Sequence, residues 1–277
     1  MRAWLVGYLA ATLAPAIANG ATRLEIRHAA AHVTIIPEAR RDILVGIVRS
    51  SRDLPIRVSR SGEATLVDGG LDRRVRGCPR LADGAFGVRV RGLGSVAAAD
   101  VPRLVIRTPF DVQVSAGDGV SGELGRTASL VFENRGCGNW TIANVLGRLR
   151  LDQIGSGAVR VGRADAADLN VAGNGNIVTG PVAGPLTAVS SGEGTISVAR
   201  VEGPLVARVA GSGAIEVKAG AAAQLNASIA GSGSIRFGGV AGGVSASVAG
   251  PGVISVRRAT GRVSRRLFGA GRIVVGP

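Results

Sequence analysis

The sequence predicts an all-β fold, a single-stranded right-handed parallel β-helix (β-solenoid) with about 19 residues in each coil. Three observations predict it: a Gly-x-Gly unit recurs at nearly constant spacing, apolar residues stand at fixed offsets from each unit, and glycine is abundant. The 277 residues include 43 glycines, and 46% of the chain is apolar. Collagen needs glycine at every third position, and a disordered chain has far fewer aliphatic residues, so this composition excludes both classes.

The Gly-x-Gly unit recurs nine times along the chain. Successive units lie 18 to 20 residues apart, and six of the eight intervals are 19 residues. A repeat at a fixed period is typical of solenoids, in which each repeat forms one structural unit that packs on its neighbours. The first glycines of the nine units are Gly117, Gly136, Gly155, Gly173, Gly192, Gly211, Gly231, Gly250 and Gly269.

Strands are predicted on both sides of each unit. From Gly136 onward the residue four positions after the first glycine is always apolar, as in Ile196 and Ile215, and an apolar residue usually follows two positions later. Because side chains alternate between the faces of a strand, this spacing puts both residues on one face. The strand before the unit is clearest in the later repeats and ragged before about residue 190; one example is Leu205, Ala207 and Val209.

The glycines fit the corners between these strands. Glycine adopts positive φ without a Cβ clash and lets neighbouring backbones approach closely. Stacking the coils about 4.8 Å apart joins the apolar positions of successive repeats into continuous internal ladders. A dinucleotide-binding or phosphate-binding interpretation of Gly-x-Gly is disfavoured, because no helical pattern follows any of the units.

The chain divides into three regions. We expect a signal peptide over residues 1–18, N-terminal cap strands and irregular first coils over 19–116, and the regular solenoid over 117–277. Alternating runs such as Arg23 to Arg27 predict the irregular strands, and a cap is expected because an open solenoid end exposes strand edges. At the other end Arg265 stands in an inward position that alanine holds in earlier coils. The final coil is therefore either frayed or itself the cap.

The first eighteen residues predict export. Arg2 precedes an apolar stretch from Trp4 to Leu13, and the sequence from Ala16 to Ala18 is a small-x-small cleavage site. About a dozen apolar residues are too few to cross a bilayer, which requires about 20. We therefore expect a cleaved signal peptide and an exported protein, periplasmic first, with the cell surface or secretion as alternatives.

Cys78 and Cys137 are the two cysteines of the sequence. Export would place them in an oxidising compartment, where disulfides persist, so we predict that they pair. The bond would close a loop of about 60 residues and stabilise the fold by about 4 kcal/mol in the chain-entropy model. Residues from Leu71 to Gly87 would form an excursion loop that carries Cys78 to the corner. The alternative is two small, unbonded buried residues.

Several repeats also carry a family resemblance. The units Gly173 to Ile177, Gly211 to Ile215 and Gly231 to Ile235, in an exported glycine-rich β-repeat chain, resemble the bacterial family named "putative auto-transporter adhesin, head GIN domain". The resemblance covers roughly residues 100 to 277 and rests on a structural motif. It implies a parallel β-helix at or outside the inner membrane and an adhesin-like function, with no catalytic residues to transfer.

The alternative function is that of a β-helix polysaccharide lyase or glycoside hydrolase. Asp118 and Glu193, the two acids in the middle position of the units, are predicted to lie four coils apart, about 19 Å. Paired glycosidase carboxylates lie within about 5–9.5 Å. We therefore predict no catalytic residue and a protein that is not an enzyme, although acids on different ladders could still converge.

No metal or cofactor is predicted. His28 and His32 are four residues apart, and no acid completes a recognised metal-binding spacing with them. Asp118 alone does not make the calcium-binding nonapeptide, which needs an aspartate in every turn.

Basic residues dominate the C-terminal end. The formal net charge of the chain is +14, and the last 61 residues, after Glu216, contain eight basic residues and no acid. Arginine attracts anions and contacts phosphate or carboxylate bidentately, so the predicted partners are anionic polysaccharide, lipopolysaccharide or the envelope surface. Nucleic acid is not expected, because export and the scarcity of aromatic residues for stacking disfavour it. The ratio of 32 arginines to one lysine favours the other interpretation, a coding bias towards arginine whose charge only keeps the open end soluble and unpaired. The candidate ligand-binding residues are Arg257, Arg258, Arg262, Arg266 and Arg272.

Overall fold

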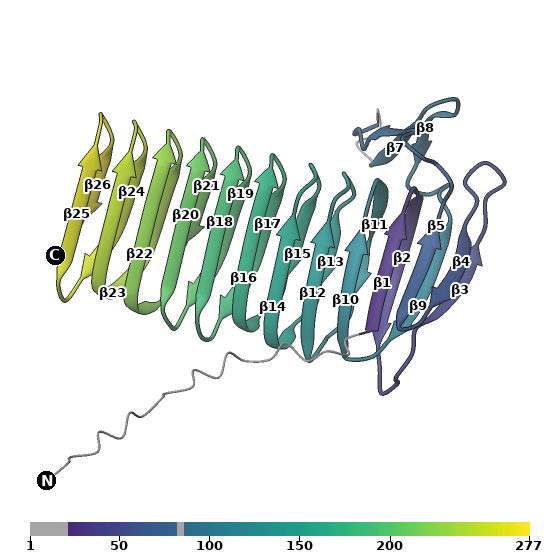
Figure 1. Cartoon of the computed structure of the whole chain (residues 1–277), viewed down its shortest axis with the longest axis horizontal. Helices are drawn as coiled ribbons and strands as arrows, with labels where there is room; N and C mark the ends of the chain where they lie inside the picture. The colour runs from purple at the N-terminus through teal and green to yellow at the C-terminus, as the bar shows by residue number, and fades with distance from the viewer. Residues whose placement is uncertain (1–21, 82–85) are drawn as a thin grey trace, which may run out of the picture.

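The computed structural model describes residues 22–81 and 86–277. It confirms the predicted β-solenoid: the chain winds into a rod of stacked coils, and all the described secondary structure is β (Figure 1). The expected signal peptide, residues 1–18, lies outside the described residues.

Twenty-three strands form one hydrogen-bonded sheet that folds over into two walls. Each coil contributes one strand to each wall. Each of these strands pairs in parallel register with the equivalent strand of the next coil. In the regular region the first wall contains β10 (Asp111–Ala116), β12 (Ser129–Asn134), β14 (Val145–Gln153), β16 (Ala164–Gly173), β18 (Leu186–Gly192), β20 (Leu205–Gly211), β22 (Ala221–Gly231) and β25 (Val263–Phe268). The second wall contains β11 (Gly119–Leu124), β13 (Trp140–Ile142), β15 (Ala158–Val161), β17 (Asn176–Val182), β19 (Thr195–Val201), β21 (Ala214–Val217), β24 (Val253–Ala259) and β26 (Arg272–Val275). The long strand β23 (Ser234–Ala249) runs through a bend and belongs to both walls.

The predicted apolar ladders stack in register. Ile196 pairs with Ile177 on one side and with Ile215 on the other, and the series continues through Ile235 and Ile254. All five side chains are at most 2% exposed. Burial of such branched side chains stabilises a fold by about 1.5–3 kcal/mol each, so these ladders form the axis around which the coils are held.

The two glycines of each unit have different physical roles. The first glycine has positive φ from Gly173 onward, for example 134° at Gly192. The second has no room for a side chain, because a Cβ at Gly194 would lie 2.3 Å from the carbonyl oxygen of Gly175. Both reasons that the sequence suggested for glycine therefore apply, at separate positions of the corner.

Three corners are supported by buried polar side chains that the repeat pattern did not predict. The amide nitrogen of Asn134 donates to the side-chain oxygen of Gln153 (3.0 Å) and to the carbonyl of Gly138 (3.1 Å). The Gln153 amide donates to Gly155 (2.9 Å), and the Ser190 hydroxyl donates to Gly194 (2.8 Å). These side-chain donors bind carbonyl groups within the tight corner; the Gly194 carbonyl also accepts the backbone N–H of Ala214 at 3.3 Å.

The N-terminal strands enter the rod out of sequence order. β1 (Thr22–Arg27) lies between β10 and β5 (Ala64–Asp68), and is parallel to both. β2 (Ala30–Pro37) likewise lies between β11 and β9 (Arg103–Thr108). In Figure 1 this first pair of strands stands inside the stack and not at its end. The chain therefore builds its second coil before its first.

Two antiparallel strands close the N-terminal end of the rod. β3 (Leu44–Arg49) pairs with β9, and β4 (Arg57–Ser61) pairs with β5. The antiparallel direction ends the parallel stack, as a cap requires. The N-terminal end of the rod is therefore formed by two antiparallel edge strands, one on each wall.

The C-terminal coil has no comparable cover among the described residues. β25 pairs only with β23, and β26 pairs only with β24. Arg265 pairs with Ala246, as the sequence predicted for an inward position, and its side chain is exposed. The final coil remains hydrogen-bonded along its length, so it is ordered and not frayed.

We predict that the second glycine of a corner cannot be replaced. Gly194→Ala should lower the free energy of unfolding by about 1–3 kcal/mol, because its Cβ must displace a backbone carbonyl. Gly117→Ala is the matched control: it lies in the same motif, has no positive φ, and its Cβ would meet the nearest atom at an ordinary 3.6 Å. Chemical unfolding followed by circular dichroism measures both, and equal losses would contradict the account.

Candidate functional site

A groove of about 950 Å³ lies on the outer face of the first wall, near the N-terminal end of the rod. Its floor is formed by outward side chains of three adjacent strands, β1, β10 and β12, and the loop after β5 contributes Asp72 and Arg73. We call it the corner groove, because it reaches the first Gly-x-Gly corner. Its polar lining residues are Arg23, Glu25, Arg27, His28, Asp72, Arg73, Gln113, Ser115, Asp118, Glu133 and Arg135.

Ion pairs join the charged residues at the floor of the groove. Arg135 contacts Glu133 at 2.8 Å, and this carboxylate raises the pKa of the guanidinium. Ser115 donates a hydrogen bond to the other oxygen of Glu133 (3.3 Å). Arg27 contacts Asp68 at 3.1 Å and Glu25 at 3.6 Å. Most acids in or beside the groove therefore already have a cationic partner.

Asp68, at the end of β5, holds the loop that forms one side of the groove. One carboxylate oxygen accepts a hydrogen bond from the Gly70 backbone N–H at 2.8 Å, and the other contacts Arg27. The Gly70 N–H, together with Arg27, lowers the pKa of Asp68 below its ordinary value. The carboxylate form is thus the one that the loop conformation stabilises.

His28 connects three segments at the edge of the groove. Its Nδ1 lies 3.0 Å from a carboxylate oxygen of Asp72 and 3.5 Å from Asp68. Its backbone N–H donates to the side chain of Asp118 at 2.7 Å. His32 lies on β2, so the two histidines lie in different elements and do not form a pair.

Backbone strain is concentrated around the corner groove. His28, Arg73 and Asp118 are the non-glycine residues of the described chain with positive φ, at 50°, 52° and 55°. All three line the groove. Such conformations are uncommon for residues with a Cβ and persist where surrounding contacts hold them, often at functional sites. The three non-glycine residues with positive φ in the described chain are therefore gathered at one place, the corner groove.

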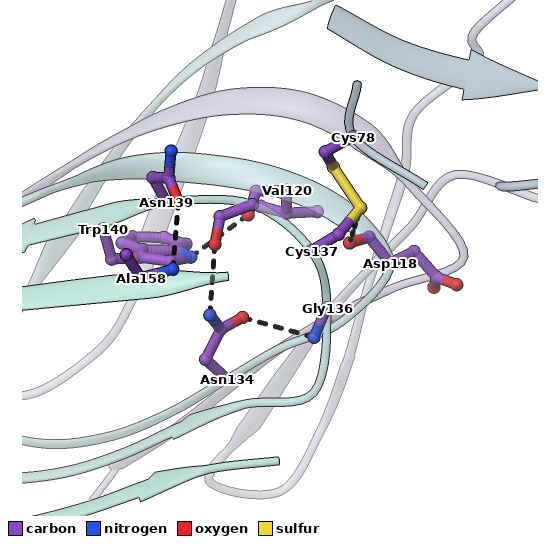
Figure 2. The surroundings of a disulfide bond; sticks show 10 residues. Cys78, Asp118, Val120, Asn134, Gly136, Cys137, Asn139, Trp140 and Ala158 are labelled. Carbon is purple, nitrogen blue, oxygen red and sulfur yellow. Dashed lines mark hydrogen bonds between the residues drawn. A yellow bond between two sulfur atoms is a disulfide. The ribbon is translucent and has the colours of Figure 1, made fainter. Parts of the chain in front are cut away.

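The disulfide between Cys78 and Cys137 confirms the predicted pairing. The Cα atoms lie 5.5 Å apart, within the range of ordinary disulfides, and the two residues are 59 positions apart in sequence (Figure 2). The bond ties the excursion after β5 to the corner next to Asp118, whose carbonyl accepts the backbone N–H of Cys137 at 2.8 Å. It therefore fixes the loop segment that faces the groove.

The excursion is a small folded sheet, longer than the predicted loop from Leu71 to Gly87. It contains β6 (Val75–Gly77), β7 (Gly87–Val90) and β8 (Gly94–Ala97), paired antiparallel. A second apolar cluster lies beneath it, including Leu71, Val90 and Val101. Val88 packs over the corner so closely that a Cβ at Gly119 would lie 2.5 Å from its methyl group. This packing and the disulfide together seat the excursion on the corner.

Only one of the two acids that the sequence analysis considered as a catalytic pair lies in the corner groove. Asp118 lines the groove, but Glu193, its counterpart in the corner ladder, does not. Glu25, Asp72 and Glu133 come from three different segments, and the insertion of β1 next to β10 is what brings Glu25 there. No repeat signal could indicate this neighbourhood. Within the described residues there is no group of three or more His, Cys, Asp or Glu side chains that could hold a metal ion.

The candidate arginines all lie in the last two coils, at the opposite end of the rod. Arg257 and Arg258 are at the end of β24, and Arg262 is in the following bend. Arg266 is on β25 and Arg272 begins β26, on either side of the last corner. All five side chains are exposed. Three of the five arginines therefore lie around the bend between β24 and β25, and the other two lie on either side of the last corner. Both groups are at the C-terminal end of the rod.

The fold is shared with solved structures. A protein of Parabacteroides merdae described as a "putative adhesin" has a TM-score of 0.62 and 13% identity, with 94% of this chain and 93% of that chain covered. A "putative adhesin" of Parabacteroides distasonis has a TM-score of 0.58, 12% identity and 92% coverage of both chains. A "putative lipid binding protein" of the same species has a TM-score of 0.55, 18% identity and 93% coverage of both.

At these identities the likeness shows a common architecture along nearly the whole length of the chain. No protein-family model and no curated protein matches the sequence. No family match therefore supports the resemblance to the head GIN domain family, whereas the two structures described as "putative adhesin" share the fold of this chain. In the part of the chain that the structure describes, no helix has the length and apolar character needed to cross a membrane.

We predict that the disulfide controls the excursion and not the rod. Replacing both Cys78 and Cys137 by serine should make residues of the excursion accessible to limited proteolysis, while residues 145–277 stay protected by their ladders. Mass spectrometry of the fragments locates the cuts, and the oxidised wild-type protein is the control. Cleavage spread evenly over both regions would show that the bond stabilises the whole rod.

The lowered pKa of Asp68 predicts a local acid response. The Gly70 contact stabilises the fold when Asp68 is charged, so its contribution is present above the unfolded-state pKa and is lost as the pH falls through the lowered folded-state pKa. The Gly70 amide proton shift in an NMR titration should report a midpoint below the ordinary value of about 3.9. Asp68→Asn should abolish that titration, and a midpoint at or above the ordinary value would refute the assignment.

Proposed function

We propose that the protein is an exported, non-enzymatic β-solenoid that acts as an adhesin-like or envelope interaction protein and binds an anionic glycan or lipopolysaccharide. The disulfide supports export, because disulfides persist in oxidising compartments and are rare in the cytosol. The descriptions of two fold neighbours as adhesins support the adhesin-like part. The periplasm is the compartment we propose, in agreement with the predicted signal peptide.

One observation carries the choice of ligand: five exposed arginines gather in the last two coils, and no acid follows Glu216 in the sequence. Seven arginines elsewhere pair with an acid, as Arg150 does with Asp152 and Arg148 with Asp168, whereas none of the five forms an ion pair within the described residues. The unbalanced end therefore carries a positive potential that attracts polyanions, and each guanidinium can contact a carboxylate or phosphate bidentately.

The proposal predicts salt-sensitive retention on anionic polymers. The wild-type protein should bind immobilised polygalacturonate or lipopolysaccharide at low salt and be released as salt screens the charges. Changing all five candidate arginines to alanine should weaken binding at least ten-fold, because the cluster acts together. The variant residues are Arg257, Arg258, Arg262, Arg266 and Arg272.

The matched control removes the same charge from other places. It replaces five exposed arginines spread over the rest of the rod, and its affinity should fall less than about three-fold because long-range attraction alone is reduced. Equal losses in the two variants would show that net charge, and not a site, retains the polymer. The control residues are Arg57, Arg89, Arg103, Arg160 and Arg208.

The second candidate function is polysaccharide cleavage in the corner groove. It is favoured by one observation, the convergence of Glu25, Asp118 and Glu133 with arginines in a groove that could hold a sugar. Against it, Glu25 pairs with Arg27, Glu133 pairs with Arg135, and Asp118 accepts the backbone N–H of His28, so each of these carboxylates already has a partner within the protein. Incubation with a panel of uronic-acid polymers decides: release of reducing or unsaturated ends, abolished by Glu133→Gln, would replace our proposal.

A further inference from the structure

The two long edges of the rod differ in charge. The Gly-x-Gly corners form one edge, and the bends that lead from the second wall back to the first form the other, opposite the excursion (Figure 1). The nine Gly-x-Gly units contain two acids and no basic residue, whereas the bends contain eight basic residues and two acids. A uniform bias towards arginine would not produce this difference. The bends, which we call the bend edge, are residues 125–129, 143–148, 162–166, 180–185, 199–204, 218–224, 238–243 and 257–262.

Three arginines of the bend edge stand at equivalent positions in every second coil. A series of buried residues pairs from coil to coil through the bends: Thr127, Val145, Ala164, Val182 and Val201. The residue just before each of them is exposed, and in the same order these residues are Arg126, Asn144, Arg163, Pro181 and Arg200. Arginine therefore alternates with an uncharged residue, and the arginine positions recur about every 9.6 Å, twice the distance between adjacent strands.

We call Arg126, Arg163 and Arg200 the bend arginines, and the protein itself leaves most of their charge unused. Arg126 and Arg163 form no ion pair within the described residues, and Arg200 pairs with Glu202. Asp165, the other acid of the bend edge, is exposed. An exposed pair such as that of Arg200 contributes little to stability, so an external anion can replace Glu202.

The row of cations continues to the C-terminal end of the rod. Lys218 lies in the bend one coil after Arg200, and Arg257 and Arg258 lie in the bend two coils after Lys218. From Arg126 to Arg257 the row spans seven coils, about 34 Å. Three of the five candidate ligand-binding arginines belong to this last bend. They therefore form one end of a longer cationic line.

A line of this kind fits a linear polyanion that lies along the rod. Neighbouring bend arginines are separated by about the Debye length at 0.1 M salt, about 10 Å, so each of them attracts a separate charge. In an extended polyuronate ribbon each sugar ring advances the chain by about one coil spacing, about 4.8 Å. Successive rings alternate in orientation, so the carboxylates that face one side recur at every second ring, as the bend arginines recur at every second coil. A compact group of phosphates reaches only one of these positions.

We propose that the bend edge binds a linear polyuronate along its length. The inference rests on the proposed function and deepens it, because it names the polymer class and adds Arg126, Arg163 and Arg200 to the contact surface. Each bend arginine contacts one carboxylate bidentately, while the arginines of the last bend hold one end of the polymer. Binding strengthens with polymer length, because every contact after the first forms at a high effective concentration.

Calorimetric titration of the full chain with galacturonate oligomers of increasing length tests this inference. The wild-type affinity should rise with length up to about eight rings, the number that spans seven coils, and should fall as salt is added. The triple variant Arg126→Ala, Arg163→Ala and Arg200→Ala should bind polygalacturonate about ten-fold more weakly. It should bind trigalacturonate, which covers only the last bend, as the wild type does. Circular dichroism checks its fold, which should be unchanged because all three side chains are exposed.

A change of the opposite sign locates the contact at Arg200. Glu202→Gln removes the carboxylate that pairs with Arg200 and should strengthen polymer binding about two-fold. Unchanged or weaker binding would show that Arg200 does not contact the polymer.

The matched control for the triple variant removes the same charge from the outer faces of the walls. It carries Arg103→Ala, Arg160→Ala and Arg208→Ala, all at exposed positions on strands. Its affinity for polygalacturonate should fall less than about three-fold, because only long-range attraction is reduced. Equal losses in the two triple variants would overturn the assignment of the bend edge.

The same measurements separate this inference from the proposed function. If the bend variant binds polygalacturonate as the wild type does while the variant of the five C-terminal arginines does not, the inference is wrong and the proposed function stands. The same conclusion follows if affinity does not depend on oligomer length, or if the wild type binds lipopolysaccharide and no polyuronate. If the wild type binds neither at low salt, both are wrong.

Discussion

The structure depends on one constraint: each coil must place its backbone in hydrogen-bonded parallel register with the coil before it. Adjacent strands then lie about 4.8 Å apart, and any side chain on the inward face must pack against its own equivalents. This is why isoleucine follows isoleucine from Ile177 to Ile254. It is also why the second glycine of a corner has a carbonyl oxygen where its Cβ would be. Sequence repetition is the direct chemical consequence of the stack.

A ladder of this kind has two ends, and arginine stands on the inward face of both. Arg60 on β4 pairs with the buried Thr65, and its guanidinium donates to the carbonyl of Ile43 at 2.7 Å. Arg265 on β25 pairs with Ala246 at the other end. Inward charges on edge strands oppose the addition of another apolar strand, so both ends resist indefinite end-to-end growth. The rod is thereby kept at a finite length and its outer surfaces remain available for partners.

Features that recur could be predicted from the sequence, whereas among the features that occur once only the disulfide could be predicted. The coil length, the ladder of isoleucines and the glycine corners each had many copies to indicate them. The pairing of Cys78 with Cys137 followed from there being two cysteines and a predicted exported protein. The insertion of β1 between β5 and β10 had no repeat behind it, and the corner groove depends on that insertion. For the same reason, the contacts of His28 with Asp68 and Asp72 required three-dimensional neighbours that no spacing encodes.

Distances along one outward ladder test the stacked register most directly. Spin labels at Arg160 and, in turn, at Arg236, Ser255 or Val274 are separated by four, five and six coils of the same ladder. Pulsed electron paramagnetic resonance should give separations of about 19, 24 and 29 Å, rising by about 4.8 Å with each coil. Separations that do not increase with coil number would contradict the stacked architecture, and with it the placement of the corner groove.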